Sequence, residues 1–184
     1  MFLLWAVLLG LLIGFLRRGR LANLARLRLS GLWLILAALV IQLLIFPLGR
    51  AEPLIRWGTG YLHLLSYLFL LAFIGLNWRY FEILLMGLGL ALNLLVISIN
   101  GGYMPASASA LRRAGLERVA GILEQGLHHG NTVLMSATTK LNLLGDILYV
   151  PSTVPLANAF SVGDLLLALG IIIFLALEMP RARP

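Results

Sequence analysis

The sequence predicts an all-α integral membrane protein with about five transmembrane helices and a polar outer segment. Three observations favour this fold class: 61% of the 184 residues are hydrophobic, only 11% are charged, and the apolar residues form long runs. A soluble domain of this size could not bury so much apolar surface, whereas a helix of about 20 apolar residues crosses a bilayer. We expect residues 1–184 to form a single polytopic domain.

Five apolar runs are long enough, or nearly so, to cross a bilayer. The first is short, but no basic residue precedes it and no small-residue cleavage site follows it, so we interpret it as a retained helix rather than a signal peptide. The predicted spans are residues 2–16, 32–48, 61–78, 81–99 and 162–179, and the outer segment is residues 100–161.

The arginines predict how the chain lies in the membrane. Eight of the 13 gather in the first loop, in the turn between the third and fourth spans, and after the last span, at Arg17, Arg18, Arg20, Arg26, Arg28, Arg79, Arg181 and Arg183. The outer segment also carries Arg112, Arg113, Arg118 and Lys140, but long loops are less bound by the charge rule. With five crossings these regions share one face, which the positive-inside rule makes cytoplasmic. We therefore expect a bacterial inner-membrane protein with its N-terminus and outer segment outside.

The charge balance indicates membrane lipids as partners. The chain carries 14 Lys and Arg against 7 Asp and Glu, a formal net charge of +7. Since the basic residues lie between apolar runs, they match anionic headgroups better than nucleic acid. The sequence does not identify any partner chain.

The outer segment contains one amphipathic pattern. Leu116, Val119, Ala120, Leu123 and Leu127 recur at helical spacing, which predicts an interfacial helix within residues 106–127. Residues 131–150 are too polar for a simple span. They fit either a re-entrant hairpin buried against protein or a second interfacial helix.

Polar residues within or beside the spans gather in the outer half of the predicted bundle. Such residues are costly in a bilayer and often mark a functional site. We expect Gln42, His63, Asn93, Asn100, Gly101 and Gly102 to bind substrate. The alternative is structural, with the amides bonding between helices, the histidine anchoring an interface and the glycines forming a turn.

Asp146 and Asp164 are the only aspartates of the chain, and each follows a glycine and precedes an aliphatic run. Two carboxyl groups facing each other across a cleft do not readily ionise together, so one holds a proton while the other acts as a base. That arrangement activates water for attack on a carbonyl. Alternatively, each aspartate stabilises a helix N-terminus, with Ser161 as the cap before Asp164.

The sequence predicts neither a metal nor a cofactor. There is no cysteine, which excludes disulfides and thiolate sites. His128 and His129 have poor spacing for a metal and no carboxylate close by in sequence.

The second aspartate lies in the stretch 158-NAFSVGDLLLALGIII-173. This stretch resembles the last motif of the lipoprotein signal peptidases, a Phe-Asn-x-Ala-Asp sequence that opens the final helix. The resemblance implies that Asp164 is one of two catalytic carboxylates, that Asp146 in 145-GDILYV-150 is the other, and that 100-NGGYMP-105 stands for the Asn-x-Gly loop of that family. Here Ser161 and Gly163 replace the family's Asn and Ala, the Asn-Gly loop comes late, and five spans replace four.

The whole pattern of Asn-Gly-Gly-x-Met-Pro, Leu-Gly-Asp and Phe-Ser-x-Gly-Asp resembles a bacterial multi-pass membrane family of unknown function. Two functions follow as hypotheses. One is an Asp-dyad hydrolase or peptidase acting on a membrane-anchored peptide or a lipid. The other is a non-enzymatic protein, or an accessory subunit, that binds a lipid, a quinone or a partner chain.

Overall fold

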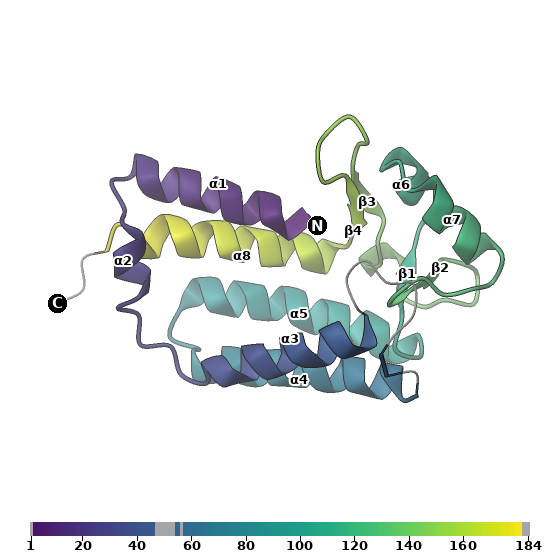
Figure 1. The fold of residues 1–184 in the computed structure, drawn as a ribbon, viewed down its shortest axis with the longest axis horizontal. Coiled ribbons are helices and arrows are strands. Elements are labelled where there is room, and N and C mark those ends of the chain that lie inside the picture. The colour runs from purple at the N-terminus through teal and green to yellow at the C-terminus, as the bar shows by residue number, and fades with distance from the viewer. Residues whose placement is uncertain (1, 47–53, 56, 182–184) are drawn as a thin grey trace.

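The computed structural model describes residues 2–46, 54–55 and 57–181. Within them, five long helices lie side by side: α1 (Phe2–Leu16), α3 (Leu32–Ile45), α4 (Thr59–Leu76), α5 (Phe81–Ile99) and α8 (Val162–Glu178). Their contacts give the order α1, α8, α5, α4, α3, which Figure 1 shows as a layer of roughly parallel rods. α8 therefore lies between α1 and α5. The structure confirms that the fold is mostly helical.

Two helices, α4 with 18 residues and α5 with 19, are long and apolar enough to cross a membrane, while α1 and α3 are shorter apolar helices. The bounds of α1 and α5 agree with the predicted spans, α4 begins and ends two residues early, and α8 ends one residue early. α3 ends at Ile45, and residues 47–48 of its predicted span lie outside the described residues.

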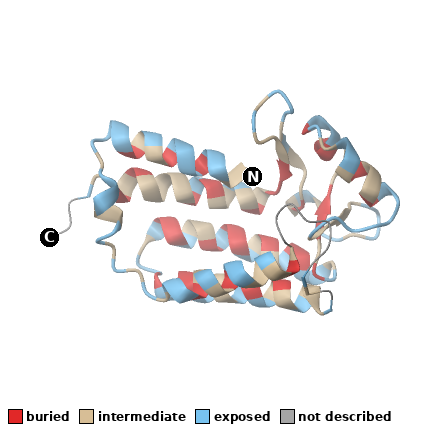
Figure 2. Cartoon of the chain, in the orientation of Figure 1, coloured by how far each residue is buried: buried red, intermediate tan, exposed pale blue. Residues whose placement is uncertain are grey.

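Large apolar side chains cover the outside of the helices. Leu12 of α1 is 55% exposed, Leu36 of α3 is 63% exposed, and Leu68 of α4 is 54% exposed. Each long helix also has buried residues, which Figure 2 shows in red between exposed and intermediate ones. The helices thus present to their surroundings an apolar surface that soluble monomers rarely expose.

The outer segment forms a compact cap at one end of the helices (Figure 1). β1 (Met104–Ala106) pairs in parallel with β2 (Thr132–Leu134), and β3 (Leu148–Val150) pairs antiparallel with β4 (Asn158–Phe160). These strands correct the purely α prediction.

Residues 131–150 form neither of the two structures predicted for them. They contain β2, the single 3-10 turn η1 (Asn142–Leu144) and β3. Short polar side chains explain the absence of a longer helix there, because they bond locally to the backbone: Thr139 Oγ1 accepts from the N–H of Ser136, and Asn142 Nδ2 donates to the Ser136 carbonyl.

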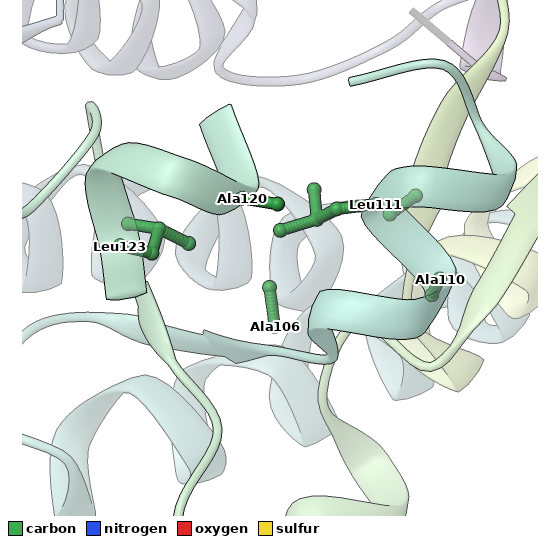
Figure 3. Packing of buried hydrophobic residues seen from close by; sticks show 6 residues of the cluster. Ala106, Ala110, Leu111, Ala120 and Leu123 are labelled. Carbon is green, nitrogen blue, oxygen red and sulfur yellow. The ribbon is translucent and has the colours of Figure 1, made fainter. Parts of the chain in front are cut away.

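The predicted amphipathic helix is broken in two. α6 (Ala108–Arg113) and α7 (Glu117–Glu124) are separated by Gly115, whose φ of +73° lies in the left-handed region. Figure 3 shows their apolar residues packed together, with Ala106 of β1 closing the cluster. The cap therefore has a hydrophobic core of its own.

The register predicted for that helix is correct up to its last position. Leu123 is 1% exposed, and Leu116 and Val119 pack against the core of the cap. Leu127, predicted to be buried, is 56% exposed. α7 ends at Glu124 and Gly126 turns the chain with a φ of +77°, so Leu127 leaves the apolar face.

The opposite end of the bundle carries the arginine-rich loops. The short helix α2 (Leu21–Leu24) and the residues around it cross this end, close to the turn between α4 and α5 and to the end of α8 (Figure 1). The bundle therefore has a basic end and a capped end.

Candidate functional site

A cavity of about 360 Å³ lies where the cap meets α4, α5 and α8. Asp146 and Asp164 both line it, although they come from different segments. The other polar residues of its lining are Tyr67, Asn93, His129, Asn131, Thr132 and Asn158. The structure thus brings the two predicted carboxyl groups to one cavity.

Asp164 is held by the N-terminus of α8 and by α5. Its Oδ1 accepts a hydrogen bond of 2.8 Å from Asn93 Nδ2, and its Oδ2 accepts one of 3.1 Å from the Ser161 N–H. Ser161 Oγ accepts from the Asp164 N–H at 2.9 Å and donates to Asn93 Oδ1 at 2.8 Å. Asp164 and Ser161 therefore form a capping box, and Asn93 joins it from the neighbouring helix.

Close approach of two backbones brings Asn93 to this box. A Cβ on Gly163 would lie 2.0 Å from Asn93 Oδ1, and a Cβ on Gly89 would lie 2.4 Å from the Gly163 carbonyl oxygen. No side chain fits at either position. Glycines on both helices thus allow α5 and α8 to approach closely enough for the amide to reach the carboxylate.

Asp146 is positioned by backbone pairing with β1. Its N–H donates to the Pro105 carbonyl at 2.9 Å, and its carbonyl accepts from the Ser107 N–H at 3.0 Å. The residue is followed by β3 rather than by a helix. The alternative that Asp146 stabilises a helix N-terminus is therefore wrong, because the element that follows it begins as a strand at Leu148.

The pKa of Asp146 is raised from 3.8 to about 7, chiefly by burial and then by the negative charge of Asp164. Near neutral pH this carboxyl group is therefore divided between its protonated and charged forms. The hydroxyl of Tyr67 lies within interaction range of Asn93 and of both carboxyl groups. Burial and the neighbouring carboxyl group thus favour the protonated form of Asp146, which is the form that can donate a proton.

Gln42 and His63 belong to a different network. Gln42 Nε2 donates to Ser66 Oγ at 3.1 Å, and Ser66 Oγ donates to the His63 carbonyl at 2.7 Å. The His63 ring is 2% exposed, and its Nδ1 lies 3.1 Å from the Gly102 carbonyl oxygen. These residues tie α3, α4 and the turn after α5 together, and they do not line the cavity.

Asn100, Gly101 and Gly102 shape the turn that leads from α5 to β1. Asn100 joins the end of α5 to the backbone of Lys140 by two hydrogen bonds. Its Oδ1 accepts from the Lys140 N–H at 2.8 Å, and its Nδ2 donates to the Lys140 carbonyl at 2.9 Å. Gly101 and Gly102 have φ values of +71° and +94°, and a Cβ on Gly102 would lie 2.7 Å from Gly60 Cα. Asn100 faces a separate cavity of about 480 Å³.

Several cavity residues are absent from the sequence-based site. Tyr67 follows His63 by one helical turn on α4, and this spacing is the one local signal that pointed to it. His129, Asn131 and Thr132 reach the cavity through the pairing of β2 with β1, and Asn158 through the pairing of β4 with β3. Within the described residues, no group of three or more His, Asp or Glu side chains is placed to hold a metal ion.

The fold and the cavity define a helical protein with two carboxyl groups beneath a small mixed cap. Residues 26–176 match a family of unknown function (DUF5317), so the chain belongs to that family. Neither the curated proteins nor the solved structures compared with the chain include a match.

Proposed function

We propose that the chain is a five-span protein of the bacterial inner membrane, with its N-terminus and the cap outside. Two observations support this placement. The outer faces of the helices are apolar, and most of the described arginines lie at the end opposite the cap, where Arg17, Arg18, Arg20, Arg26, Arg28, Arg79 and Arg181 outnumber Arg112, Arg113 and Arg118 of the cap. The shorter helices α1 and α3 fit such a bundle if the bilayer thins beside them or if they cross with little tilt.

We propose further that Asp146 and Asp164 act together in hydrolysis of a membrane-anchored peptide or a lipid. The observation that supports this function best is that the two carboxyl groups share one cavity, where burial, and then the charge of Asp164, raises the pKa of Asp146. Two carboxyl groups in one cavity can supply an acid and a base when one of them keeps its proton.

The proposed reaction follows from the two positions. Asp164, held by Asn93 and Ser161, removes a proton from a water molecule, whose oxygen attacks the substrate carbonyl carbon. Protonated Asp146 donates to the carbonyl oxygen. When the tetrahedral intermediate collapses, the bond to the amine or alcohol breaks, and the proton held by Asp164 passes to that leaving group. As the carbonyl re-forms, the hydroxyl that Asp146 had protonated returns its proton to Asp146, so both carboxyl groups regain their starting states and the other product is a carboxylic acid.

A binding function is the second candidate, and the capping box favours it. Both carboxylate oxygens of Asp164 already accept hydrogen bonds from the protein, which suits a structural role at the start of α8. In this alternative the cavity holds a lipid headgroup, a quinone or part of a partner chain without changing it.

Replacement of each aspartate by asparagine separates the two functions. Membranes from bacterial cells that express the wild type, D146N or D164N are compared by mass spectrometry of their lipids and small membrane proteins. For a dyad, each variant folds but loses the cleavage products, and the double variant is no worse than either single one. The exposed Glu117 supplies the matched control E117Q, which keeps the wild-type profile.

Asparagine caps a helix about as well as aspartate. Retention of the full product profile by both asparagine variants would therefore rule out the hydrolase and leave the binding function.

A further inference from the structure

A second cavity, of about 640 Å³, lies at the basic end of the bundle, far along the helices from the aspartates. It is bounded by the segment before α3, by the turn between α4 and α5, and by the residues after α8. Its charged lining consists of Arg28, Arg79, Arg181 and Glu82. The hydrolytic function proposed above uses none of these residues.

Glu82 marks this cavity as a binding site. The residue lies in the first turn of α5 and is 4% exposed, yet it lines the cavity. Within the described residues, its Oε1 is buried and has no hydrogen-bond partner. A buried carboxylate oxygen without a donor is unfavourable. A ligand that brings an N–H donor into the cavity would remove this cost.

The arginines of the cavity supply the opposite charge. Arg181 pairs with Glu178, whereas in the described part of the chain no ion pair involves Arg28 or Arg79. The guanidinium of Arg79 lies 5.8 Å from the ring centre of Trp78. The cavity therefore offers one buried acceptor beside guanidinium groups free to bind an anion, which is a pattern for a ligand carrying both charges.

Aromatic side chains beside the cavity indicate its depth in the membrane. Trp78 is 61% exposed and Phe81 is 69% exposed, and both line it. Exposed aromatic residues next to arginines are typical of the level of the lipid headgroups. The position of the cavity at the headgroup level follows from the membrane placement proposed above and does not depend on the proposed hydrolytic activity.

We propose that this cavity binds the headgroup of an aminophospholipid. The primary ammonium donates to Glu82, and the phosphate accepts from Arg28 and Arg79. A choline headgroup has the same charges but no N–H, so it cannot satisfy the buried oxygen. A free aminoalkyl phosphate shares the recognised chemistry and is distinguished from the lipid by the test.

The test measures thermal unfolding of the purified full chain in detergent while phospholipids with identical acyl chains are titrated in. The headgroups are ethanolamine and its mono-, di- and trimethylated forms. We expect stabilisation by each, with apparent affinity falling at every methylation and about tenfold or more weaker for choline than for ethanolamine, since a hydrogen bond to a charged group contributes about 1.5–3 kcal/mol. Water-soluble phosphoethanolamine is titrated in parallel. If it stabilises the protein only at far higher concentrations than the ethanolamine lipid, the ligand is the lipid rather than the free aminoalkyl phosphate.

Two variants assign the chemistry to residues. E82M removes the acceptor oxygens and should bind all four lipids alike, and R79Q should bind all four more weakly while keeping their order. E124Q, a glutamate change in the cap at the other end of the molecule, should behave like the wild type. Equal wild-type affinities for ethanolamine and choline lipids would overturn the proposal, as would a retained preference in E82M. If E82M does not fold, the wild-type methylation series still decides.

Discussion

Each aspartate of the candidate site depends on the glycine before it for its position. A Cβ on Gly145 would lie 2.4 Å from the Pro105 carbonyl oxygen, where the chain pairs with β1. A Cβ on Gly163 would lie 2.0 Å from Asn93 Oδ1. The repeated Gly-Asp dipeptide therefore has a geometric cause, because at both places the backbone must approach another segment before the carboxyl group can enter the cavity.

Protonation of Asp146 should make the stability of the protein depend on pH. Its pKa is about 7 in the folded chain and near 3.8 when exposed, so between these values the folded state binds more protons than the unfolded state. Stability therefore falls as the pH rises through this window and levels off above the folded pKa. We expect the unfolding midpoint of the wild type in detergent to be lower at pH 8 than at pH 5.

D146N should lose most of this fall and should be more stable than the wild type at pH 8, because no charge has to be buried. The exposed Glu117 again supplies the control, since E117Q should retain the wild-type slope. A D146N midpoint with the wild-type pH dependence would show that the titrating group lies elsewhere.

Local sequence predicted the charged part of the site and missed most of its neutral part. The aspartates and Asn93 stand out because polar side chains beside apolar runs are costly. Gln42, His63 and Asn100 stand out for the same reason, but their polar atoms bond to other parts of the bundle. That rule detects a polar group in an apolar environment, and it cannot tell a partner within the protein from a substrate.

At the scale of elements, the contact between α5 and α8 depends on small residues facing each other. Gly89 meets the Gly163 carbonyl, and a Cβ on Gly170 would lie 2.5 Å from Met86 Cγ. Glycine is unfavourable within a helix, but in membrane bundles it permits close backbone approach. The same contact positions Asn93 against Asp164, so helix packing and site geometry are linked.

G163A should therefore separate the helices and disturb the site. We expect it to destabilise the chain by about 1–3 kcal/mol, as overpacking of a tight contact does. G121A is the matched control: a Cβ there meets nothing within 4 Å, and the residue lies inside α7. It should stabilise by roughly 0.5–1 kcal/mol, because alanine is the better helix former. Thermal unfolding in detergent measures both, and a G163A midpoint at or above that of G121A would contradict the close packing.

The long helices were predictable from the sequence because apolar runs of this length leave few alternatives, whereas the elements of the cap were not. The apolar pattern begins at Leu116, after Gly115, so it did not indicate the separate short helix α6 that precedes the break. The strands have three residues each, too few for an alternating pattern, and β1 and β2 pair across the two intervening helices. Such pairing depends on tertiary contacts.

At the scale of the whole molecule, the basic end and the capped end predict how the protein lies in the membrane. We expect reporter fusions after Arg28 and after Arg79 to read cytoplasmic, because those arginines resist translocation. A fusion after Gln125, in the cap, should read external. The same fusions in a variant that carries both R26Q and R28Q serve as a control, because they show how much the charge of the first loop contributes to the orientation. A cytoplasmic signal after Gln125 would invert the orientation and place the aspartate cavity inside the cell.

The position of α8 between α1 and α5 has a consequence for synthesis on the ribosome. α1 is made before the other four long helices, yet the helix that it chiefly contacts follows all of them: Gly10 and Gly14 of α1 lie against Leu175 and Met179. Until α8 emerges, α1 lacks its principal neighbour and the cavity lacks Asp164. A nascent chain that stalls before α8 therefore carries Asp146 alone, so the pair of carboxyl groups is completed only when α8 has been made.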